Sequence, residues 1–438
     1  MSPNSSRDWL RSPSKTSRLR CSSSRFAALL LLLVWAEFAG SSARLAARID
    51  GDEISITAVD AETPDEVHRI RVRLLDVTRA AVEDLVDRRL DIRDPAERSR
   101  LYAARNVTIR LPGSHALETT LPGELVVASI GKVPIHAAAV EERQALRLYR
   151  LRGELYLQRR RNLDALIDRR LLQRHARVEG TTLEVLESRL ARTGSVTNAE
   201  LEEYVARERA SGRRIDDPER VRPYLAFQKH YRRRASLLQA LRAQVRIDIE
   251  LQPPVSPSLP METKGGVTLG SPDDRVLVVY TNYSCALCRA THLEIDRLLA
   301  DKRQPRVVLK DFVLDPVAME AAALVRCAAS RGGAAAVRKL LLSRNPPASG
   351  TAWLGDEAMR SAAHSAGMTV PMLQECTRSP SIRAQIEHDT RSAKRLGFDD
   401  PPAFVVAGMP LSGMQSAELL RDALAGRYRP QLQPSPAQ

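Results

Sequence analysis

The sequence predicts a mostly α-helical first half and an α/β second half. Apolar residues recur at helical spacing through most of residues 44–250, and prolines crowd the stretch 251–270. Beyond that stretch, an apolar strand leads directly into a Cys-x-x-Cys motif and an amphipathic helix. The 438 residues exceed what one hydrophobic core usually serves, so two or three domains are expected. A hydrophobic content of 43% excludes a wholly disordered chain.

The amino terminus, residues 1–43, has the order of a secretory signal. A basic leader is followed by the apolar run Phe26–Trp35 and by small residues at Ala39–Ala43. A bilayer-spanning helix needs about 20 apolar residues, so a cleaved signal peptide is favoured over an uncleaved signal anchor. The protein is therefore expected in the periplasm or a similar extracytoplasmic compartment, held at the membrane if the signal stays uncleaved. Cleavage would remove Cys21 and leave four of the five cysteines.

Basic residues outnumber acidic ones, 67 to 53, which gives a net charge of +14. The excess is spread along the chain without a basic block rich in aromatic residues, so no nucleic-acid partner is expected. The densest basic runs, Arg159–Arg161 and Arg232–Arg234, fall within helical patterns and are better explained as solvated helix faces.

Residues 47–90 and 128–171 form an ungapped internal repeat. The copies share strand-like starts, apolar positions such as Leu74 and Leu155, and nearly identical helix ends. In each copy the apolar spacing passes from about 2 to about 3.6 residues, which predicts a short strand, a turn and one or two amphipathic helices. A unit this small cannot bury its own apolar face, so the copies should pack on each other or on the following helices.

Three further helices and a strand complete the first half. The helices are predicted at Thr181–Arg192, at Val196–Tyr204 with a Thr-x-x-Glu cap, and at about Pro218–Val245. Residues 245–250 alternate apolar and polar like an edge strand. The segment 251–270 then predicts an extended linker, because proline suits neither helices nor central strands.

This first half, residues 44–250, resembles the amino-terminal domain of SurA-like chaperones. The resemblance rests on Ile49-Asp-Gly-Asp-Glu-Ile54, on Leu166-Ile-Asp-Arg-Arg-Leu-Leu172 and on the helices that follow. It implies a helical domain that holds unfolded client polypeptides in an apolar cradle. The prolyl-isomerase domain that some members carry has no counterpart in the sequence. A helical spacer that positions the next domain is the alternative.

The motif that carries chemistry is Cys285-Ala-Leu-Cys288. It falls where the apolar strand Arg275–Thr281 has ended and a helix to about Ala300 begins. At a helix start, unpaired N–H groups and the positive end of the helix dipole stabilise thiolate over thiol. Cys285 is therefore expected to be the exposed nucleophile. Cys288, one turn further on, can close a disulfide with it or resolve a mixed disulfide.

Such a pair can also bind zinc or form a static disulfide. Zinc needs four ligands, and the sequence has neither a second Cys-x-x-Cys nor a histidine pair at usable spacing; His292 alone does not complete a site. A static disulfide would close so short a loop that it would constrain the unfolded chain rather little. Neither a metal nor another cofactor is expected.

The second half, residues 271–428, resembles the DsbA-like branch of the thioredoxin superfamily. The matching segments are Tyr280–Cys288, Val307–Pro316, the helical insertion around Ala321–Ala328, and Leu396–Gly408. The resemblance implies a thioredoxin-like fold with a helical insertion and thiol–disulfide oxidoreductase activity. It also places Pro402 at the family's cis-proline, which borders the active cysteines and helps to present an extended substrate. An ordinary trans proline in a turn is the alternative for Pro402.

Three departures from the family pattern bear on the mechanism. Val279 stands where members commonly place a buried acid that helps to move protons. Asp400-Pro401 precedes Pro402 in place of the usual Gly-Thr or Gly-Val, and Ala286-Leu287 lacks the histidine that favours an oxidising potential. The direction of electron flow therefore stays open among oxidase, isomerase and reductase.

The remaining cysteines, Cys327 and Cys376, lie in helical patterns of the insertion. They can form a second disulfide or stay as buried free thiols, and four cysteines allow three pairings. Residues 429–438 are expected to form a disordered tail.

These features predict an exported thiol–disulfide oxidoreductase with an attached client-binding domain. Cys285 would attack or be attacked, Cys288 would resolve the mixed disulfide, and Pro402 would help to hold the client. The expected partners are folding exported polypeptides with cysteines and a membrane or soluble redox partner. One alternative is a non-enzymatic chaperone or assembly factor whose thioredoxin-like domain only binds. A reductase that keeps one partner's thiols reduced is a third possibility.

Overall fold

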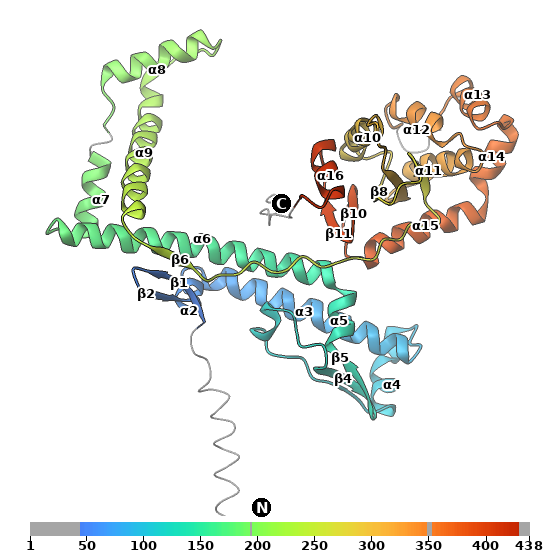
Figure 1. Ribbon diagram of the computed structural model, residues 1–438, viewed down its shortest axis with the longest axis horizontal. Coiled ribbons are helices and arrows are strands. Elements are labelled where there is room, and N and C mark those ends of the chain that lie inside the picture. The colour runs from blue at the N-terminus through green and yellow to red at the C-terminus, as the bar shows by residue number, and fades with distance from the viewer. Residues whose placement is uncertain (1–43, 193–194, 348–352, 429–438) are drawn as a thin grey trace, which may run out of the picture.

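The computed structural model describes residues 44–192, 195–347 and 353–428. It has a helical first half and an α/β second half, so the predicted fold class is confirmed (Figure 1). The predicted signal, residues 1–43, and the predicted tail, residues 429–438, lie outside the described residues. Among the described helices, none is both long and apolar enough to cross a membrane.

The two copies of the repeat have the same order of elements: a β-hairpin, a short helix and a long helix. The first copy consists of β1 (Leu45–Ile49), β2 (Asp52–Ser55), α2 (Ile56–Asp60) and α3 (Pro64–Arg89). The second consists of β4 (Val126–Ile130), β5 (Val133–His136), α5 (Ala137–Arg143) and α6 (Ala145–Val178). Each copy thus starts with two strands where the sequence indicated one. The chain reverses between the two strands of each hairpin because residues there adopt positive φ angles: Asp50 and Gly51 in the first copy, and Gly131 in the second.

The copies pack on each other through equivalent positions. One buried cluster contains Val67, Ile70 and Leu74 of α3 together with their equivalents in α6, Leu148, Leu151 and Leu155. Arg73 and Glu154, which are 81 residues apart and also equivalent, form an ion pair at 2.6 Å. Contacts between equivalent positions are those expected near a two-fold axis, so the copies are related by an approximate internal two-fold.

The copies also keep one ion pair. Arg71 contacts Asp60 at 2.6 Å in the first copy, and the equivalent Arg152 contacts Glu141 at 2.6 Å in the second. In each copy this pair joins the short helix to the long one, so the repeat extends to polar contacts as well as to the apolar core.

Two small antiparallel sheets form around the hairpins. The segment between the copies contributes η1 (Pro95–Glu97), α4 (Arg98–Ala104), β3 (Val107–Ile109) and η2 (Ala116–Glu118). Strand β3 joins the second hairpin in the order β3-β4-β5. Strand β6 (Ile247–Ile249), within the predicted edge strand, pairs with β1 and gives the order β2-β1-β6. Each hairpin therefore gains a third strand beside its first one.

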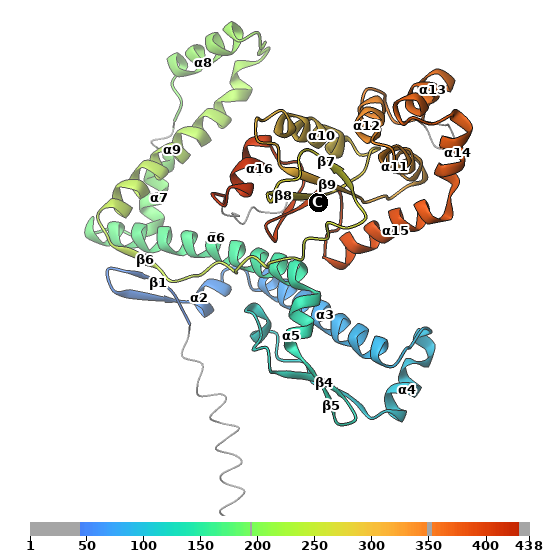
Figure 2. The same cartoon turned by 45° about the vertical axis from the view of Figure 1, so that its right-hand side comes forward.

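An arm of helices stands at the far end of α6, away from the α/β domain, as Figure 2 shows. It consists of α7 (Leu183–Arg192), α8 (Asn198–Ala210), η3 (Pro218–Val221) and α9 (Arg222–Ala243). The predicted cap is present as a capping box, in which Thr197 and Glu200 each bond the other's backbone N–H. A small cluster around Leu172, Ala176, Leu186 and Leu238 joins α7 and α9 to α6.

The proline-rich segment runs along α6 to the α/β domain (Figure 1). It is held at both ends, because Leu251 is buried with the first half and Leu259 with the second. The prediction that the linker extends to residue 270 is wrong, since β7 (Val267–Leu269) is an edge strand of the second domain's sheet. Its apolar Val267 and Leu269 are buried, and the strand pairs antiparallel with β9 (Arg306–Asp311), where Val267 lies opposite Leu309.

The second domain has a five-stranded sheet in the order β11-β10-β8-β9-β7. The remaining strands are β8 (Val276–Thr281), β9 (Arg306–Asp311), β10 (Ala403–Val406) and β11 (Met409–Ser412). Strands β8 and β9 are parallel, and the other pairings are antiparallel. The helices are α10 (Ala286–Leu299), α11 (Pro316–Ala329), α12 (Ala334–Leu342), α13 (Asp356–Ser365), α14 (Val370–Arg378), α15 (Pro380–Arg395) and α16 (Ala417–Leu424).

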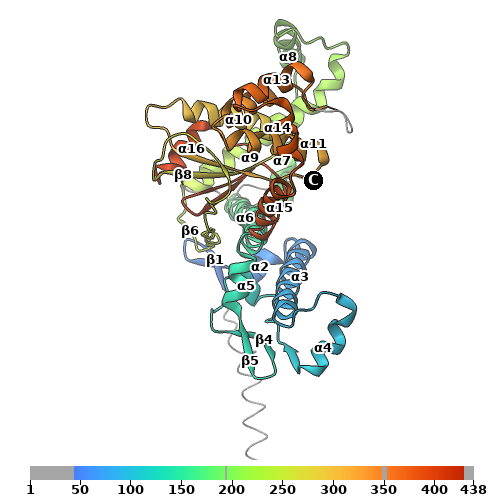
Figure 3. The ribbon, with the colours of Figure 1, turned by 90° about the vertical axis from the view of Figure 1, so that its right-hand side faces the viewer.

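The two faces of this sheet are covered differently. Leu277, Val279 and Leu309 point to the face covered by α10, α16 and the helical insertion. The alternate residues Val278 and Tyr280 point to the opposite face, where α15 and the first turn of α6 pack. The helical first half therefore contributes directly to the second core. Figure 3 shows α6 between the α/β domain and α3.

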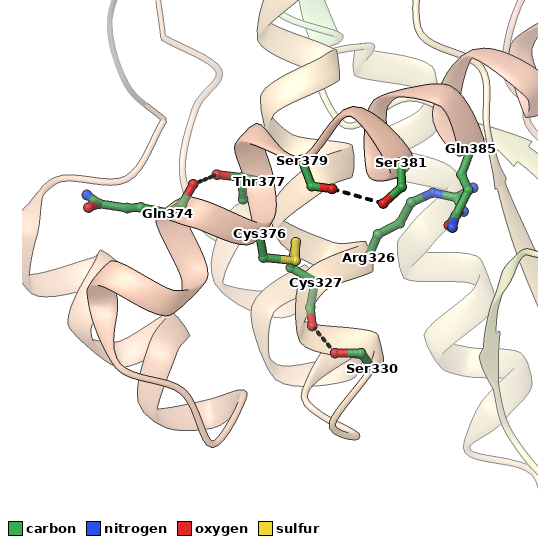
Figure 4. The surroundings of a disulfide bond; sticks show 9 residues. All are labelled: Arg326, Cys327, Ser330, Gln374, Cys376, Thr377, Ser379, Ser381 and Gln385. Carbon is green, nitrogen blue, oxygen red and sulfur yellow. Dashed lines mark hydrogen bonds between the residues drawn. A yellow bond between two sulfur atoms is a disulfide. The ribbon is translucent and has the colours of Figure 1, made fainter.

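Cys327 of α11 and Cys376 of α14 form a disulfide with an S–S distance of 2.02 Å (Figure 4). Cys327 is fully buried in the core, and Cys376 packs against the same cluster. The bond joins α11 to α14. Of the two outcomes open for these cysteines, the structure has the bonded one.

Candidate active site

Cys285 lies at the start of α10, where strand β8 has ended and the chain turns. The side chain of Asn282 accepts a hydrogen bond from the Ser284 N–H at 2.8 Å and thereby tightens this turn. Cys285 is the N-cap residue of α10, and its Sγ accepts the backbone N–H of Cys288 at 3.2 Å. The Cys285 sulfur therefore lies over the unpaired N–H groups of the first helical turn, at the positive end of the helix dipole.

The two thiols differ in access. Cys285 is partly exposed, whereas Cys288 is fully buried, and the two sulfurs are not bonded to each other. Such a pair has one sulfur that an external disulfide can reach and one that only its neighbour can reach. This is the arrangement that attack followed by internal resolution requires.

Pro402 comes directly after Pro401, whose carbonyl oxygen lies near Cys285, and the peptide bond between the two prolines is cis. The Sγ of Cys285 lies 3.8 Å from the carbonyl oxygen of Pro401. The Pro402 carbonyl accepts the Gly413 N–H at 2.9 Å, which ties this loop to the end of β11. The structure therefore brings the three predicted site residues, Cys285, Cys288 and Pro402, to one place.

Cys288 sits in a mixed environment. Burial raises the pKa of its thiol, and hydrogen bonding to the Cys285 sulfur raises it further. The backbone N–H of Asn282 and the hydroxyl of Thr281 act in the opposite direction. Val279, six residues before Cys285, is fully buried in the apolar core. Cys288 is thus held as a thiol, with hydroxyl and amide groups beside it.

Residues 262–425 match the family model described as Thioredoxin. The second domain is thioredoxin-like. The match includes β7 and all residues placed at the site, but it covers less than half of the chain. A search of curated proteins finds no match.

Several solved structures resemble the thioredoxin-like domain. A thioredoxin-like oxidoreductase from Silicibacter pomeroyi DSS-3 is 24% identical, with a TM-score of 0.33, and the match covers 37% of this chain and 92% of that one. The thiol-disulfide exchange protein alpha-DsbA2 from Wolbachia pipientis is 16% identical, with a TM-score of 0.33, over 37% and 87% of the two chains. BdbD from Bacillus subtilis is 14% identical, with a TM-score of 0.35, over 39% and 97%.

The structure places one further residue, His292, close to the site, and the sequence did not suggest this. His292, which alone does not complete a zinc site, is fully buried and stacks on Tyr283 with ring centroids 5.1 Å apart. Its Nε2 lies 3.2 Å from Thr281 Oγ1 and its Nδ1 lies 3.3 Å from Arg338 Nη1. Because a guanidinium only donates, Nδ1 accepts and Nε2 carries the proton that is donated to Thr281. The one signal in the sequence is that His292 follows Cys288 by one helical turn.

His292 makes the stability of the protein depend on pH. Burial, with the charges of Arg338 and Arg289, lowers the pKa of His292 to about 3, whereas an unfolded chain has a histidine pKa of about 6.5. Between these values the unfolded chain binds a proton that the folded protein does not, so stability falls as the pH falls through this window. From about pH 7 to about pH 4.5, wild type should lose about 2.5 kcal/mol more than His292→Gln. Urea unfolding of both proteins at the two pH values measures this difference, and equal losses would contradict it.

In the described ranges of the chain, no group of three or more His, Cys, Asp and Glu side chains is placed to hold a metal ion. The chemistry that the site can perform with its own groups is exchange between thiols and disulfides.

Proposed function

We propose that this protein is an exported thiol–disulfide oxidoreductase that acts on the cysteines of other exported polypeptides and binds these clients with its helical half. The observation that carries the proposal is the placement of Cys285, accessible at the start of a helix, over the buried Cys288. Export is supported by the signal-like order of residues 1–43.

The exchange needs only the two thiols and a client. In the reductive direction, the Cys285 thiolate attacks one sulfur of a client disulfide, and the other client sulfur leaves as a thiolate that takes up a proton. Cys288 then loses its proton and attacks Cys285 Sγ, so the client leaves as a dithiol and the enzyme holds a Cys285–Cys288 disulfide. The reverse sequence oxidises a client dithiol. A membrane or soluble redox partner, itself a dithiol or disulfide, restores the starting state.

The surface near Cys285 suits an apolar polypeptide. Three large apolar side chains are about half exposed: Leu287 at 56%, Leu314 at 52% and Met414 at 49%. Leu287 lies between the two cysteines. Leu314 precedes Asp315, which accepts a hydrogen bond from Ser284. Met414 follows Gly413, whose N–H is hydrogen-bonded to the Pro402 carbonyl. Pro401 and Pro402 have no N–H to offer an extended client, so apolar contacts should supply much of the binding.

The helical half offers an aromatic surface for the same clients. Tyr224, Phe227 and Tyr231 recur on one face of α9 and are 51%, 66% and 64% exposed. Phe227 and Tyr231 stack with ring centroids 6.4 Å apart. A row of exposed aromatics is typical of a binding surface. This surface supports the SurA-like, client-binding interpretation over that of a plain spacer, and tethering a client there would raise its concentration near the thiols.

The activity is tested by reduction of insulin and oxidation of a reduced dithiol peptide, with wild type and Cys285→Ser compared. We expect Cys285→Ser to lose both activities. Cys327→Ala/Cys376→Ala serves as the matched control, since it removes the other cysteine pair and should keep the activities if it folds. Equal rates for wild type and Cys285→Ser would end the enzymatic proposal.

A non-enzymatic chaperone or assembly factor is the second candidate, favoured by Val279 at the acid position and by Asp400-Pro401 before Pro402. Client binding is common to both candidates and is tested by the triple variant Tyr224→Ala/Phe227→Ala/Tyr231→Ala. We expect it to need several times more protein than wild type to suppress aggregation of an unfolded substrate, because buried aromatics often dominate an interface. Unchanged suppression would remove α9 from the client surface.

A further inference from the structure

The first turns of α6, in the helical half, contact the loop that leads to Pro402 in the thioredoxin-like domain. Leu146 is buried in one cluster with Tyr280 of β8 and with Phe398 of this loop. The cluster lies on the face of the sheet opposite to α10 and covers that face. The contact between the two halves is therefore part of the core that supports the site.

Arg150, one turn further along α6, makes three hydrogen bonds to this region. Its guanidinium donates to the carbonyl oxygen of Gly397 at 2.9 Å, to the carboxylate of Asp399 at 2.7 Å and to the hydroxyl of Ser412 at 2.8 Å. Gly397 and Asp399 precede β10, and Ser412 ends β11. One side chain thus holds both ends of the β10–β11 hairpin.

Gly397 shows how closely the loop approaches α6. Its φ angle is +91°, and a Cβ atom there would lie 3.2 Å from the Cβ of Leu146 and 3.5 Å from the backbone nitrogen of Arg147. A larger residue would be strained in this backbone conformation and would push the loop away from α6. The glycine at this position and its positive φ angle both fit a fixed contact between the loop and α6.

The loop that Arg150 holds forms one wall of the site. Asp399 is followed by Asp400, Pro401 and Pro402, and the carbonyl oxygen of Pro401 lies 3.8 Å from Cys285 Sγ. Ser412, the other partner of Arg150, precedes Gly413, whose N–H donates to the Pro402 carbonyl at 2.9 Å. Only Asp400 lies between Asp399, which Arg150 holds, and Pro401, whose carbonyl oxygen faces the reactive sulfur.

We propose that Arg150 is a positioning residue for client exchange: from the helical half, it fixes the loop that presents a polypeptide to Cys285. This rests on the proposed function. Arg150 touches neither cysteine, so it acts through the loop. The helical half would then serve the reaction twice, by binding clients on α9 and by holding one wall of the active site with α6.

The test compares Arg150→Ala and Arg150→Lys with wild type, with Arg160→Ala as the matched control. Arg160 lies on the same helix, away from the loop, and among the described residues its ion pairing is confined to that helix, with Asp164 at 3.1 Å. Each protein is assayed in its full-length form with two substrates. Insulin must align its backbone with the loop, whereas dithionitrobenzoate, a small disulfide, needs only access to Cys285.

We expect kcat/KM for insulin to fall about tenfold in Arg150→Ala, since a misplaced wall costs productive alignment, while the rate with dithionitrobenzoate changes less than twofold. Arg150→Lys should recover part of the loss through Asp399, and Arg160→Ala should match wild type. An equal loss with both substrates, or no loss with insulin, would overturn the proposal. If Cys285→Ser equals wild type with both substrates, the proposed function itself fails. If wild type is active and Arg150→Ala equals it, only the proposed role of Arg150 fails.

Discussion

Cys288→Ser is expected to stop turnover and to accumulate a covalent mixed disulfide between Cys285 and a client. Cys285 keeps its place at the start of α10 in this variant, so it can still attack a client disulfide. In the proposed mechanism, release comes from Cys288, the buried residue whose backbone nitrogen lies 3.2 Å from Cys285 Sγ. An intramolecular nucleophile has an effective concentration far above that of millimolar thiols in solution, so release should slow by about a thousandfold or more.

The adduct should be visible as a higher-mass band on a non-reducing gel after incubation with insulin, and dithiothreitol should remove it. Cys285→Ser/Cys288→Ser is the control, and it should form no adduct with the same client. A single Cys288→Ser variant that turns over like wild type, or that forms no adduct while wild type is active, would contradict the assignment of Cys288 as the resolving thiol.

Arg326→Met is expected to lower the free energy of unfolding by about 3–5 kcal/mol. Arg326 is 5% exposed and forms ion pairs with Asp311 and Asp389, and Lys310 contacts Asp389 at 2.9 Å. These four residues join β9, α11 and α15, and Arg326 also donates to the Gly265 carbonyl at 2.7 Å. Without its guanidinium, two buried carboxylates would share one lysine, and removing one partner of a buried charge group leaves charge uncompensated.

Urea unfolding of the purified protein measures this loss. Arg421→Ala is the matched control, because its pair with Asp301 joins side chains that are 41% and 34% exposed and should contribute only about 0–1 kcal/mol. An Arg326→Met variant as stable as this control would show that the buried charges do not hold the thioredoxin-like domain together.

The sequence predictions that agree with the structure rest on local patterns. The apolar strand before Cys285 and the amphipathic helix after it place the motif at a strand-to-helix turn, and both elements are present as β8 and α10. The Thr197–Glu200 cap is another local signal, since its two residues bond each other's backbone. These features depend on neighbours within a few residues, which a sequence displays directly.

Features that depend on distant residues could not be predicted in the same way. The Cys327–Cys376 bond joins residues 49 apart, and the sequence left both its presence and its pairing open. Strand β7 has only a weak strand pattern in the sequence, because its three residues lie beside many prolines and its partner strand lies about 40 residues further on. Arg150 could not be placed either, since its partner Asp399 is 249 residues away.

The reduction potential of the Cys285–Cys288 pair tests most directly the central claim that these thiols exchange with protein disulfides. We expect the pair to equilibrate with glutathione buffers at a potential above about −300 mV, while Cys327–Cys376 stays oxidised in the same buffers. A potential of about −120 mV would favour an oxidase, and a potential of about −270 mV would favour a reductase. A pair that forms no disulfide in any buffer, or that stays oxidised below about −300 mV like a structural bond, would contradict the claim.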